Sequence, residues 1–571
     1  MNAPTFRPDR AERVLLAEPL VEPAAPLGIA QQRLMVIMLL FMLVTAVIAA
    51  RLVQLCVVSG ADQRRAAFGQ LQRGEIVDRN GVPLATKVKL WAIAVNPQEI
   101  MGDRNALAVK LAELMPERSV ADYRRILFSR RKFYYLRRPA PPALAAAVHA
   151  IGEPGLQLLG EQHRLFPQGS LAGHVLGYAQ ETEKGLMGIG VERYFDASLR
   201  KGDQLTLSLD SRVQAAMEGE ITRRMAEVQA VGGAGVVLDV DTGEVLALAS
   251  LPTINPNAPL RVQADIPNKA TLSTYELGST FKMITFANAL ETGVIGDMRQ
   301  KIDISHPLHV GGHTIHDDEP KHRAVTIPEV MTFSSNVGTA QIADQLGADR
   351  TKAFFHKLKL DARTSIELRE RGMPLVPKYW ARTTVMTTAY GHGIAVTPLH
   401  LAEAFAALAN GGMWHPATLM KHQPGQAVPG ERVISEATSA RIRQLMRLVV
   451  LQGTGTNADA PGLRVGGKTG TAEKIVNGGY TKNANITTFA GVFPMDHPRY
   501  VVLAVLDDAK PNKGTFGFKT AGWMAAPIGK RVIARIGPLL GVRPELDKDI
   551  DVSDLLPLIL EKKVPGKNAV E

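Results

Sequence analysis

Ser279 and Lys282 stand three residues apart at the start of a segment that is otherwise almost entirely apolar. Residues at this spacing share one face of a helix, so the lysine amine is expected beside the serine hydroxyl. Burial lowers the pKa of a lysine, and the positive end of the helix dipole acts in the same direction. A neutral lysine accepts the serine proton and makes the hydroxyl a nucleophile. Taken alone, the pair is more often a serine helix cap followed by a lysine that reaches out to solvent.

A second cluster, Ser334-Ser335-Asn336, falls between two segments with helical patterns. In a short loop between helices, the Ser334 hydroxyl and the Asn336 carboxamide can point into one cleft. The common explanation of such residues is a helix cap and a turn. The cluster therefore gains weight only in combination with the first pair.

A third cluster, Lys468-Thr469-Gly470-Thr471, lies on a predicted strand. Glycines at 466, 467 and 470 weaken a strand, so we expect another backbone to approach closely there. A peptide substrate lying along the strand would provide that backbone. The alternative is a flexible, glycine-rich hairpin arm. In this order, Ser-x-x-Lys, Ser-x-Asn and Lys-Thr-Gly form the motif set of the penicillin-interacting serine enzymes.

The elements that must position these clusters begin with a membrane segment. From Leu34 to Ala50 the chain has no charged residue, and the apolar pattern continues past Arg51, so we predict a membrane-spanning anchor at 34–57. More than thirty residues precede it, which argues against a cleaved signal peptide. We predict a flexible cytoplasmic tail at 1–33 and an exported body, because almost all of the chain follows the single span.

Composition limits the remaining function classes. The chain has 571 residues, too many for one hydrophobic core, and its formal charge of +11 comes without dense basic runs. This mild excess gives little support to nucleic-acid binding. The single cysteine, Cys56, excludes an intramolecular disulfide and a cysteine-based metal site. Histidines such as His313 and His316 are not spaced as metal ligands.

Local patterns place the regular elements around the clusters. Asn80-Gly81 between two alternating segments predicts a hairpin. A second strand-turn-strand unit is predicted around Asp241–Gly243. Helices are expected at 104–127, 142–152 and Ser211–Val228, and late strands at Arg464–Lys474, Ile486–Phe493 and Tyr500–Asp507. Residues 58–228 show no catalytic cluster, which favours a spacer or binding module.

Beyond the three clusters, the chain resembles the class B penicillin-binding proteins from residue 30 onward. RGEIVDRNG (73–81) and GIGVERYFDASLRKG (188–202) resemble the pedestal of that family, and GTGTNA (453–458) resembles part of its catalytic domain. The resemblance implies an α/β (α+β) fold with one N-terminal transmembrane helix and a mixed α/β pedestal at 58–228. It also implies a transpeptidase domain at 229–540, with a five-stranded antiparallel sheet, flanking helices and a helical subdomain. A C-terminal tail would occupy 541–571.

The resemblance also implies a role for each clustered residue. Ser279 would be the acylated nucleophile, Lys282 its base, Ser334 a proton relay to the leaving amine, and Lys468 the group that orients Ser334. Substrate would be bound by the remaining residues of the motifs. Asn336 would hold the peptide amide, Thr469, Gly470 and Thr471 would hold the carboxylate, and the backbone N–H groups of Ser279 and Thr471 would form an oxyanion hole. No metal or cofactor is expected.

Within the family, Ser-Ser-Asn followed by Val-Gly resembles the division-specific FtsI type, whereas elongation-specific members more often carry Ser-x-Asp. The resemblance implies a septal peptidoglycan D,D-transpeptidase with its catalytic domain in the periplasm. It would act on stem pentapeptides, bind β-lactams and contact an FtsW-type glycosyltransferase and other division proteins. An elongation-specific enzyme, a D,D-carboxypeptidase and a penicillin-binding scaffold or sensor without turnover remain open. Leu277 departs from the family's usual proline, and no Glu-x-x-Leu-Asn segment of a class A β-lactamase is recognisable.

Overall fold

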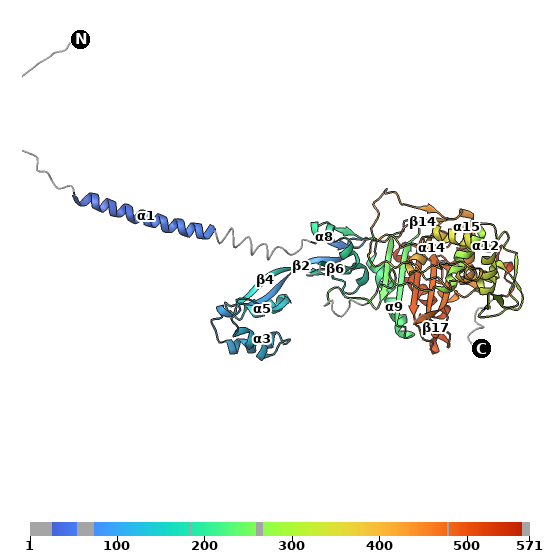
Figure 1. Ribbon diagram of the computed structural model, residues 1–571, viewed down its shortest axis with the longest axis horizontal. Coiled ribbons are helices and arrows are strands. Elements are labelled where there is room, and N and C mark those ends of the chain that lie inside the picture. The colour runs from blue at the N-terminus through green and yellow to red at the C-terminus, as the bar shows by residue number, and fades with distance from the viewer. Residues whose placement is uncertain (1–24, 54–72, 183–184, 259–265, 477–478, 562–571) are drawn as a thin grey trace, which may run out of the picture. The chain divides into compact units, whose positions relative to one another are not determined.

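The structure is a computed structural model that describes residues 25–53, 73–182, 185–258, 266–476 and 479–561 (Figure 1). The chain divides into two units, residues 1–71 and 72–571. The first unit contains one described helix, and the second contains the pedestal and the catalytic sheet. Each unit is described by itself.

Helix α1 (Ala25–Val53) contains a stretch, Gln31–Arg51, that is long and apolar enough to cross a membrane. This agrees with the predicted anchor up to Val53, and residues 54–57 lie outside the described residues. The predicted flexible tail is wrong for residues 25–33, which are helical. Pro26 does not prevent this, because a proline in the first turn of a helix removes an N–H that has no intrahelical partner.

The first part of the second unit is built around the predicted Asn80-Gly81 hairpin. Strand β1 (Ile76–Val77) pairs antiparallel with β2 (Pro83–Val95), and Gly81 takes the positive φ of 82° that the turn requires. Strand β2 also pairs with β3 (Tyr134–Ala140) and β4 (Leu156–Leu165), while β1 pairs in parallel with β7 (Leu205–Thr206). The hairpin prediction is confirmed.

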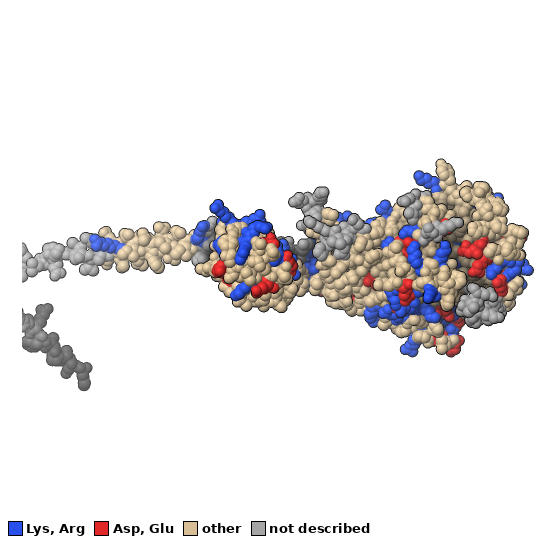
Figure 2. Space-filling model, turned by 90° about the horizontal axis from the view of Figure 1, so that it is seen from below, with Lys and Arg blue, Asp and Glu red and all other residues tan. Residues whose placement is uncertain are grey.

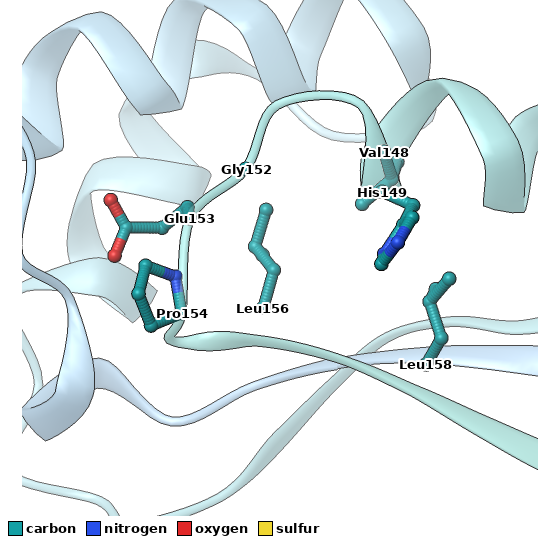
Figure 3. A pocket seen from close by; sticks show the side chains of 7 residues that line it. All are labelled: Val148, His149, Gly152, Glu153, Pro154, Leu156 and Leu158. Carbon is teal, nitrogen blue, oxygen red and sulfur yellow. The ribbon is translucent and has the colours of Figure 1, made fainter.

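Three short helices cover this sheet and form with it a head lobe, defined here as residues 83–165. They are α3 (Arg104–Leu114), α4 (Val120–Leu127) and α5 (Pro142–His149). The predicted helix at 104–127 is therefore two helices. Pro116 cannot continue the first one, and Ser119 starts the second with a capping box that includes Asp122. A hollow between α5 and β4 is lined mostly by apolar side chains, with His149 and Glu153 beside them (Figure 3).

Between the head lobe and the catalytic sheet lie short elements that complete the pedestal. They are α6 (Gly173–Leu176), β5 (Tyr178–Thr182), β6 (Gly185–Ile189), α7 (Gly190–Tyr194) and α8 (Asp196–Lys201). Helix α9 (Ser211–Glu227) follows, close to its predicted range, and Asp78 from the hairpin accepts hydrogen bonds from the Ser211 backbone and hydroxyl at its start. The hairpin loop thus fixes the first helix of the catalytic region.

The catalytic region contains the expected five-stranded antiparallel sheet, in the order β16-β17-β18-β8-β9. Alternate residues of β8 face opposite cores: Val236 packs with one cluster and Val237 with the other. Helices α9 and α17 (Ala526–Leu539) contribute to the second core. The strands are β8 (Gly232–Asp239), β9 (Val245–Leu251), β16 (Gly466–Val476), β17 (Gly479–Phe493) and β18 (Tyr500–Asp507).

A set of helices on the other core forms the helical subdomain. It includes α10 (Phe281–Glu291), α11 (Ile327–Thr332), α12 (Asn336–Lys357), α13 (Arg382–Thr388), α14 (Pro398–Ala409) and α15 (Glu436–Gln452). Small strand pairs lie at β10 (Lys301–Asp303) with β13 (Ala324–Thr326), β11 (Leu308–Val310) with β12 (His313–Ile315), and β14 (Met413–Trp414) with β15 (Glu431–Arg432). Helix α16 (Ala521–Met524) precedes α17.

The last described segment, 541–561, is packed on the catalytic region. Leu555 and Ile559 are buried in its core, and Asp549 pairs with Arg447 of α15 at 2.6 Å. The Thr326 hydroxyl at the start of α11 donates to the Leu558 carbonyl at 2.8 Å. Up to residue 561 the expected tail is therefore a strap that contacts the helix preceding Ser334.

Candidate active site

The turn before Ser279 is shaped by glycine. Gly278 has a φ of 56°, and a Cβ built on it would lie 2.6 Å from the Thr471 carbonyl oxygen, so a larger residue does not fit. A short 3-10 turn, Gly278–Thr280, then leads into α10. Ser279 is partly exposed although the residues around it are buried. The fold thus presents one hydroxyl from an otherwise closed segment.

Strand β16 lies directly against this turn. A Cβ on Gly470 would lie 2.1 Å from the Leu277 carbonyl oxygen. The sequence predicted that another backbone approaches these glycines, and the structure shows that the chain's own Leu277–Gly278 turn does so at Gly470. A peptide substrate is not needed to explain that glycine. The close approach instead brings the Lys468–Thr471 motif beside Ser279.

Lys282 lies on α10 and is fully buried, as its apolar surroundings predicted. Its Nζ donates to the Ser334 carbonyl oxygen and to the Ser334 Oγ, the latter at 3.2 Å. Burial lowers the pKa of Lys282 to about 7, although the negative charges of Asp317 and Asp318 act to raise it. Within the described residues the Ser279 hydroxyl forms no hydrogen bond. The lysine amine therefore contacts the second motif and leaves the Ser279 hydroxyl free to approach a substrate.

Ser334 lies between the amines of two lysines. Lys468 on β16 is also fully buried, and its Nζ donates to the Ser334 Oγ at 2.8 Å and to the Thr469 carbonyl at 3.0 Å. Burial and the charge of Lys282 hold the pKa of Lys468 well below its usual value. Ser334 has a φ of 59°, a left-handed conformation that is uncommon for serine. The loop between α11 and α12 holds this conformation and places the hydroxyl between the two amines.

Asn336 begins α12 and donates from Nδ2 to the His316 carbonyl oxygen at 3.1 Å. Asp317, which sequence reasoning did not select, holds this motif in place. Its carboxylate accepts hydrogen bonds from the Ser335 hydroxyl at 2.6 Å and from the backbone N–H groups of Asn336 and Val337 at 2.5 and 3.0 Å. A carboxylate at a helix N-terminus is stabilised by the helix dipole. Asp317 follows the strand pair β11–β12, well before Ser334 in the sequence. No local spacing therefore indicated that Asp317 belongs to the site.

The hydroxyl groups of the third motif contact two other loops. Thr469 Oγ1 and Thr454 Oγ1 share a hydrogen bond of 2.6 Å, and Thr471 Oγ1 accepts from the Ala521 backbone N–H at 2.9 Å. Thr454 lies in GTGTNA, a segment that sequence analysis quoted without assigning it to the site. Gly470 lies between the two threonines on β16. The structure thus brings all eight predicted residues to neighbouring positions around Ser279 and Ser334.

Glu276 is a second residue that sequence reasoning did not select. Its Oε1 accepts hydrogen bonds from the Gly393 backbone N–H and from the Tyr480 hydroxyl, both at 2.9 Å. His392 Nδ1 lies 3.4 Å from its Oε2, and the His392 ring stacks on Tyr480 with centroids 4.6 Å apart. Glu276 therefore ties the turn before Ser279 to the 390–393 loop and to the β17 arm. Its position three residues before Ser279 was the only signal in the sequence.

The site consists of hydroxyls, amines and backbone groups. In the part of the chain that the structure describes, no three His, Cys, Asp or Glu residues are grouped so as to hold a metal ion. One partly exposed serine, two buried amines and a second serine between them can activate a nucleophile and move a proton. This arrangement suits acyl transfer through a covalent intermediate.

Comparisons with known proteins agree with this chemistry. Residues 233–533 match the family described as penicillin binding protein transpeptidase domain, and residues 70–238 match the penicillin-binding protein dimerisation domain. A probable peptidoglycan D,D-transpeptidase FtsI of Caulobacter vibrioides is 39% identical over 486 residues, covering 82% of each chain. The peptidoglycan D,D-transpeptidase FtsI of Escherichia coli K12 is 29% identical and covers 83% of this chain and 84% of its own length.

A solved structure shows the same fold. The crystal structure of penicillin binding protein 3 from Mycobacterium tuberculosis, complexed with aztreonam, superimposes with a TM-score of 0.64 at 27% sequence identity. The similarity covers 83% of this chain and 97% of that one. It therefore extends over both the pedestal and the catalytic region.

Proposed function

The chain belongs to the class B penicillin-binding proteins of the FtsI type, and from this premise we propose that it is a septal peptidoglycan D,D-transpeptidase. The observation that carries the proposal is the convergence of the Lys282 and Lys468 amines on the Ser334 hydroxyl beside a partly exposed Ser279. The enzyme cross-links stem peptides during cell division. Its nucleophile, Ser279, is also the residue that β-lactams acylate.

In the first step the Ser279 Oγ attacks the carbonyl carbon of the D-Ala-D-Ala bond, and Lys282 takes its proton. Burial supports this role, because it brings the pKa of Lys282 to about 7 and leaves much of the amine neutral. The C–N bond then breaks, and the proton passes from Lys282 through Ser334 to the leaving D-alanine amine. In the second step the amine of a neighbouring stem attacks the ester carbonyl of the acyl-enzyme and forms the cross-linking amide. The ester C–O bond breaks, and the proton of the amine passes along the same route back to the Ser279 Oγ.

The oxyanion that forms in each step is stabilised by the backbone N–H groups of Ser279 and Thr471. The contact of Gly278 with the Thr471 carbonyl supports this pairing, because it places β16 beside the nucleophile turn. One such donor contributes about 3 kcal/mol to lowering the barrier. Asn336 holds the substrate's peptide amide.

The substrate carboxylate binds to the hydroxyls of β16. Thr471 Oγ1 already accepts a hydrogen bond from the Ala521 N–H, so its own proton remains available to donate. The hydrogen bond between Thr454 and Thr469 uses one of their two hydroxyl protons, so the second hydroxyl proton can be donated to the ligand. Gly470, between Thr469 and Thr471, lets the turn before Ser279 approach β16 and so brings these hydroxyls to the nucleophile. The positive potential of Lys468 adds to the attraction for an anion.

The topology of the chain completes the proposal. Helix α1 anchors it in the cell membrane, with residues before it in the cytoplasm and the pedestal (58–228) and transpeptidase domain (229–540) in the periplasm. An FtsW-type glycosyltransferase and other division proteins are the proposed partners of the anchor and pedestal.

Labelling of the full-length chain with a fluorescent penicillin tests the nucleophile. Ser279→Ala should abolish the covalent adduct, whereas Ser305→Ala, a serine outside the site, should label at the wild-type rate. An adduct on the Ser279→Ala protein would refute the assignment. Incubation of a pentapeptide donor with and without an amine acceptor then separates cross-linking from carboxypeptidase activity or mere binding. Localisation to midcell rather than to the lateral wall separates the division enzyme from an elongation enzyme.

A further inference from the structure

A loop of the head lobe carries an unusual surface that the catalytic reaction does not use. From the end of α4 into the first two residues of β3, the residues Phe128–Tyr135 read FSRRKFYY, and we call them the basic-aromatic loop. Phe128 is 55% exposed and Phe133 41% exposed, and the three cations between them are all exposed. Figure 2 shows Lys and Arg side chains gathered on the lobe that contains α3 and α5.

The three cations of this loop are not neutralised by the protein. Among the described residues, no carboxylate lies within ion-pair distance of Arg130, Arg131 or Lys132. Adjacent like charges repel one another, and no carboxylate of the described residues offsets that cost at close range. The flanking arginines are paired instead: Arg125 with Asp122, Arg137 with Glu117, and Arg138 with Glu161.

The aromatic rings lie among these cations. The Arg131 guanidinium lies 5.8 Å from the centre of the Tyr134 ring, and Arg138 lies 4.9 Å from that of Tyr135. Phe133 and Tyr135 form an edge-to-face pair with centroids 4.8 Å apart. A guanidinium held over a ring keeps N–H groups that can still donate to an anion. The Tyr134 ring therefore orients Arg131 while leaving its N–H donors usable.

The core of the lobe takes only Tyr134 from this loop, as a partly buried ring packed against it. Its interior is filled by Tyr123, Leu127 and Leu136, which are buried. Along β3 the buried Leu136 alternates with the outward-facing Tyr135 and Arg137, as a half-buried strand requires. The exposed rings and unpaired cations are thus an addition to a complete fold, and such surfaces mark sites of binding.

We propose that the basic-aromatic loop is a second binding site for uncross-linked peptidoglycan strands, separate from the catalytic cleft. This inference rests on the proposed function, because that reaction defines a substrate polymer whose uncross-linked stem peptides end in free carboxylates. Carboxylates match the unpaired cations, and the apolar faces of sugar rings match the exposed aromatic rings. A polymer held at two places binds more tightly than at either alone, which keeps a strand near the cleft between reactions.

The size of the surface favours a strand over a lipid surface. Arg130, Arg131 and Lys132 are consecutive, so their backbone spans about 10 Å at most. That length suits one or two carboxylates on a chain, whereas the basic clusters that bind anionic membranes typically hold about four to eight Lys or Arg.

Co-sedimentation with insoluble peptidoglycan tests the proposal. Full-length protein in detergent is first acylated with a fluorescent penicillin, which closes the catalytic cleft and reports independently on Ser279. The pellet fraction is then measured with isolated peptidoglycan sacculi at low and high NaCl concentration. We expect binding that falls with salt, and a variant carrying Arg130→Gln, Arg131→Gln and Lys132→Gln should bind at least tenfold more weakly.

A matched control loses the same charge elsewhere: Arg363→Gln, Arg369→Gln and Lys378→Gln, three exposed cations of the catalytic region. It should bind sacculi like the wild type. Equal binding by the two triple variants, or binding insensitive to salt, would overturn the proposal. Loss of binding to phosphatidylglycerol vesicles without any change in binding to sacculi would overturn it in favour of a membrane. Failure of penicillin acylation would instead refute the proposed function, whatever the sacculus result.

Discussion

Both the pedestal and the active site bury cations, but they surround them differently. In the pedestal, Arg73 donates to Glu192 at 2.8 Å and to Asp196 at 2.5 Å, and Arg164 donates to the other Glu192 oxygen at 2.7 Å. In the active site, the described hydrogen-bond partners of the Lys282 and Lys468 amines are all hydroxyl and carbonyl oxygens.

This difference separates cations that stabilise the fold, the pedestal arginines, from a lysine that can transfer a proton. Carboxylates in direct contact neutralise the charge of the pedestal arginines, and such a network loses much stability when one partner is removed. Without a carboxylate in contact, burial lowers the pKa of a lysine, so Lys282 can take up and release a proton near neutral pH. The charges of Asp317 and Asp318 raise the pKa of Lys282. The Asp317 carboxylate, however, accepts its hydrogen bonds from the Ser335–Val337 segment and not from the lysine amine.

Lys282→Arg should have the largest effect, because it makes the active site resemble the pedestal. Arginine stays charged at neutral pH, so the site would hold a permanent cation, as the pedestal does, and would lose its base. We expect the rate of labelling by fluorescent penicillin to fall by about 10³, within the range typical of a general base. Thermal unfolding checks that the variant is folded. A folded variant with the wild-type labelling rate would show that Lys282 is not the base.

Glu192→Gln should act on stability and leave the chemistry intact. It removes the carboxylate that both Arg73 and Arg164 contact, so we expect a loss of about 3 kcal/mol in the free energy of unfolding, measured with urea. The labelling rate of the folded fraction should stay unchanged. As a control, Asp344→Asn breaks the exposed pair with Arg382 and should cost less than about 1 kcal/mol. Equal losses in the two variants would contradict the structural role of the pedestal network.

The pH dependence of the labelling rate tests whether Lys282 exchanges a proton near neutral pH, as the pedestal arginines do not. Since the pKa of Lys282 is about 7, the labelling rate should rise with pH and level off above 8, and it should be about tenfold lower at pH 6. The folded pKa lies below that of the unfolded chain, so the unfolded chain binds more protons between pH 7 and 10.5, and the contribution of Lys282 to stability rises with pH there. A labelling rate that is flat from pH 6 to 8 would exclude a lysine base with this pKa.

Tyr480→Phe should have the smallest effect. It removes one hydrogen bond to Glu276, worth about 1 kcal/mol, and loosens the link between the turn before Ser279 and the β17 arm. We expect the labelling rate to fall about fivefold with no change in its pH midpoint. Tyr379→Phe, at a tyrosine that is 86% exposed, serves as the control. A shifted pH midpoint would mean that Tyr480 acts on the base and not on the geometry.

Much of the fold followed from local patterns. Asn80-Gly81 predicted its hairpin, and the strand predicted at Tyr500–Asp507 is an apolar run that is buried along its whole length. Both signals are local, because turn chemistry and short apolar runs act over a few residues. Where a longer-range partner decides, prediction was weaker. Strand β17 begins at Gly479, earlier than predicted, because its first residues pair with the end of β16 across a bulge at Glu473–Lys474. The strap at 541–561 likewise depends on contacts with α11 and α15.

The sequence alone determined the chemical groups of this protein: a serine and a lysine in an apolar helix, a second serine, and a lysine on a strand. It also indicated that Lys282 would be buried, since its neighbours are apolar. Only the tertiary structure decided which groups meet. Lys282 contacts Ser334 across 52 residues of chain, Lys468 reaches the same hydroxyl across 134, and Asp317 and Glu276 enter the site without a motif. Spacing along one helix describes neighbours within a turn, whereas contacts between separate elements arise from how their apolar faces pack.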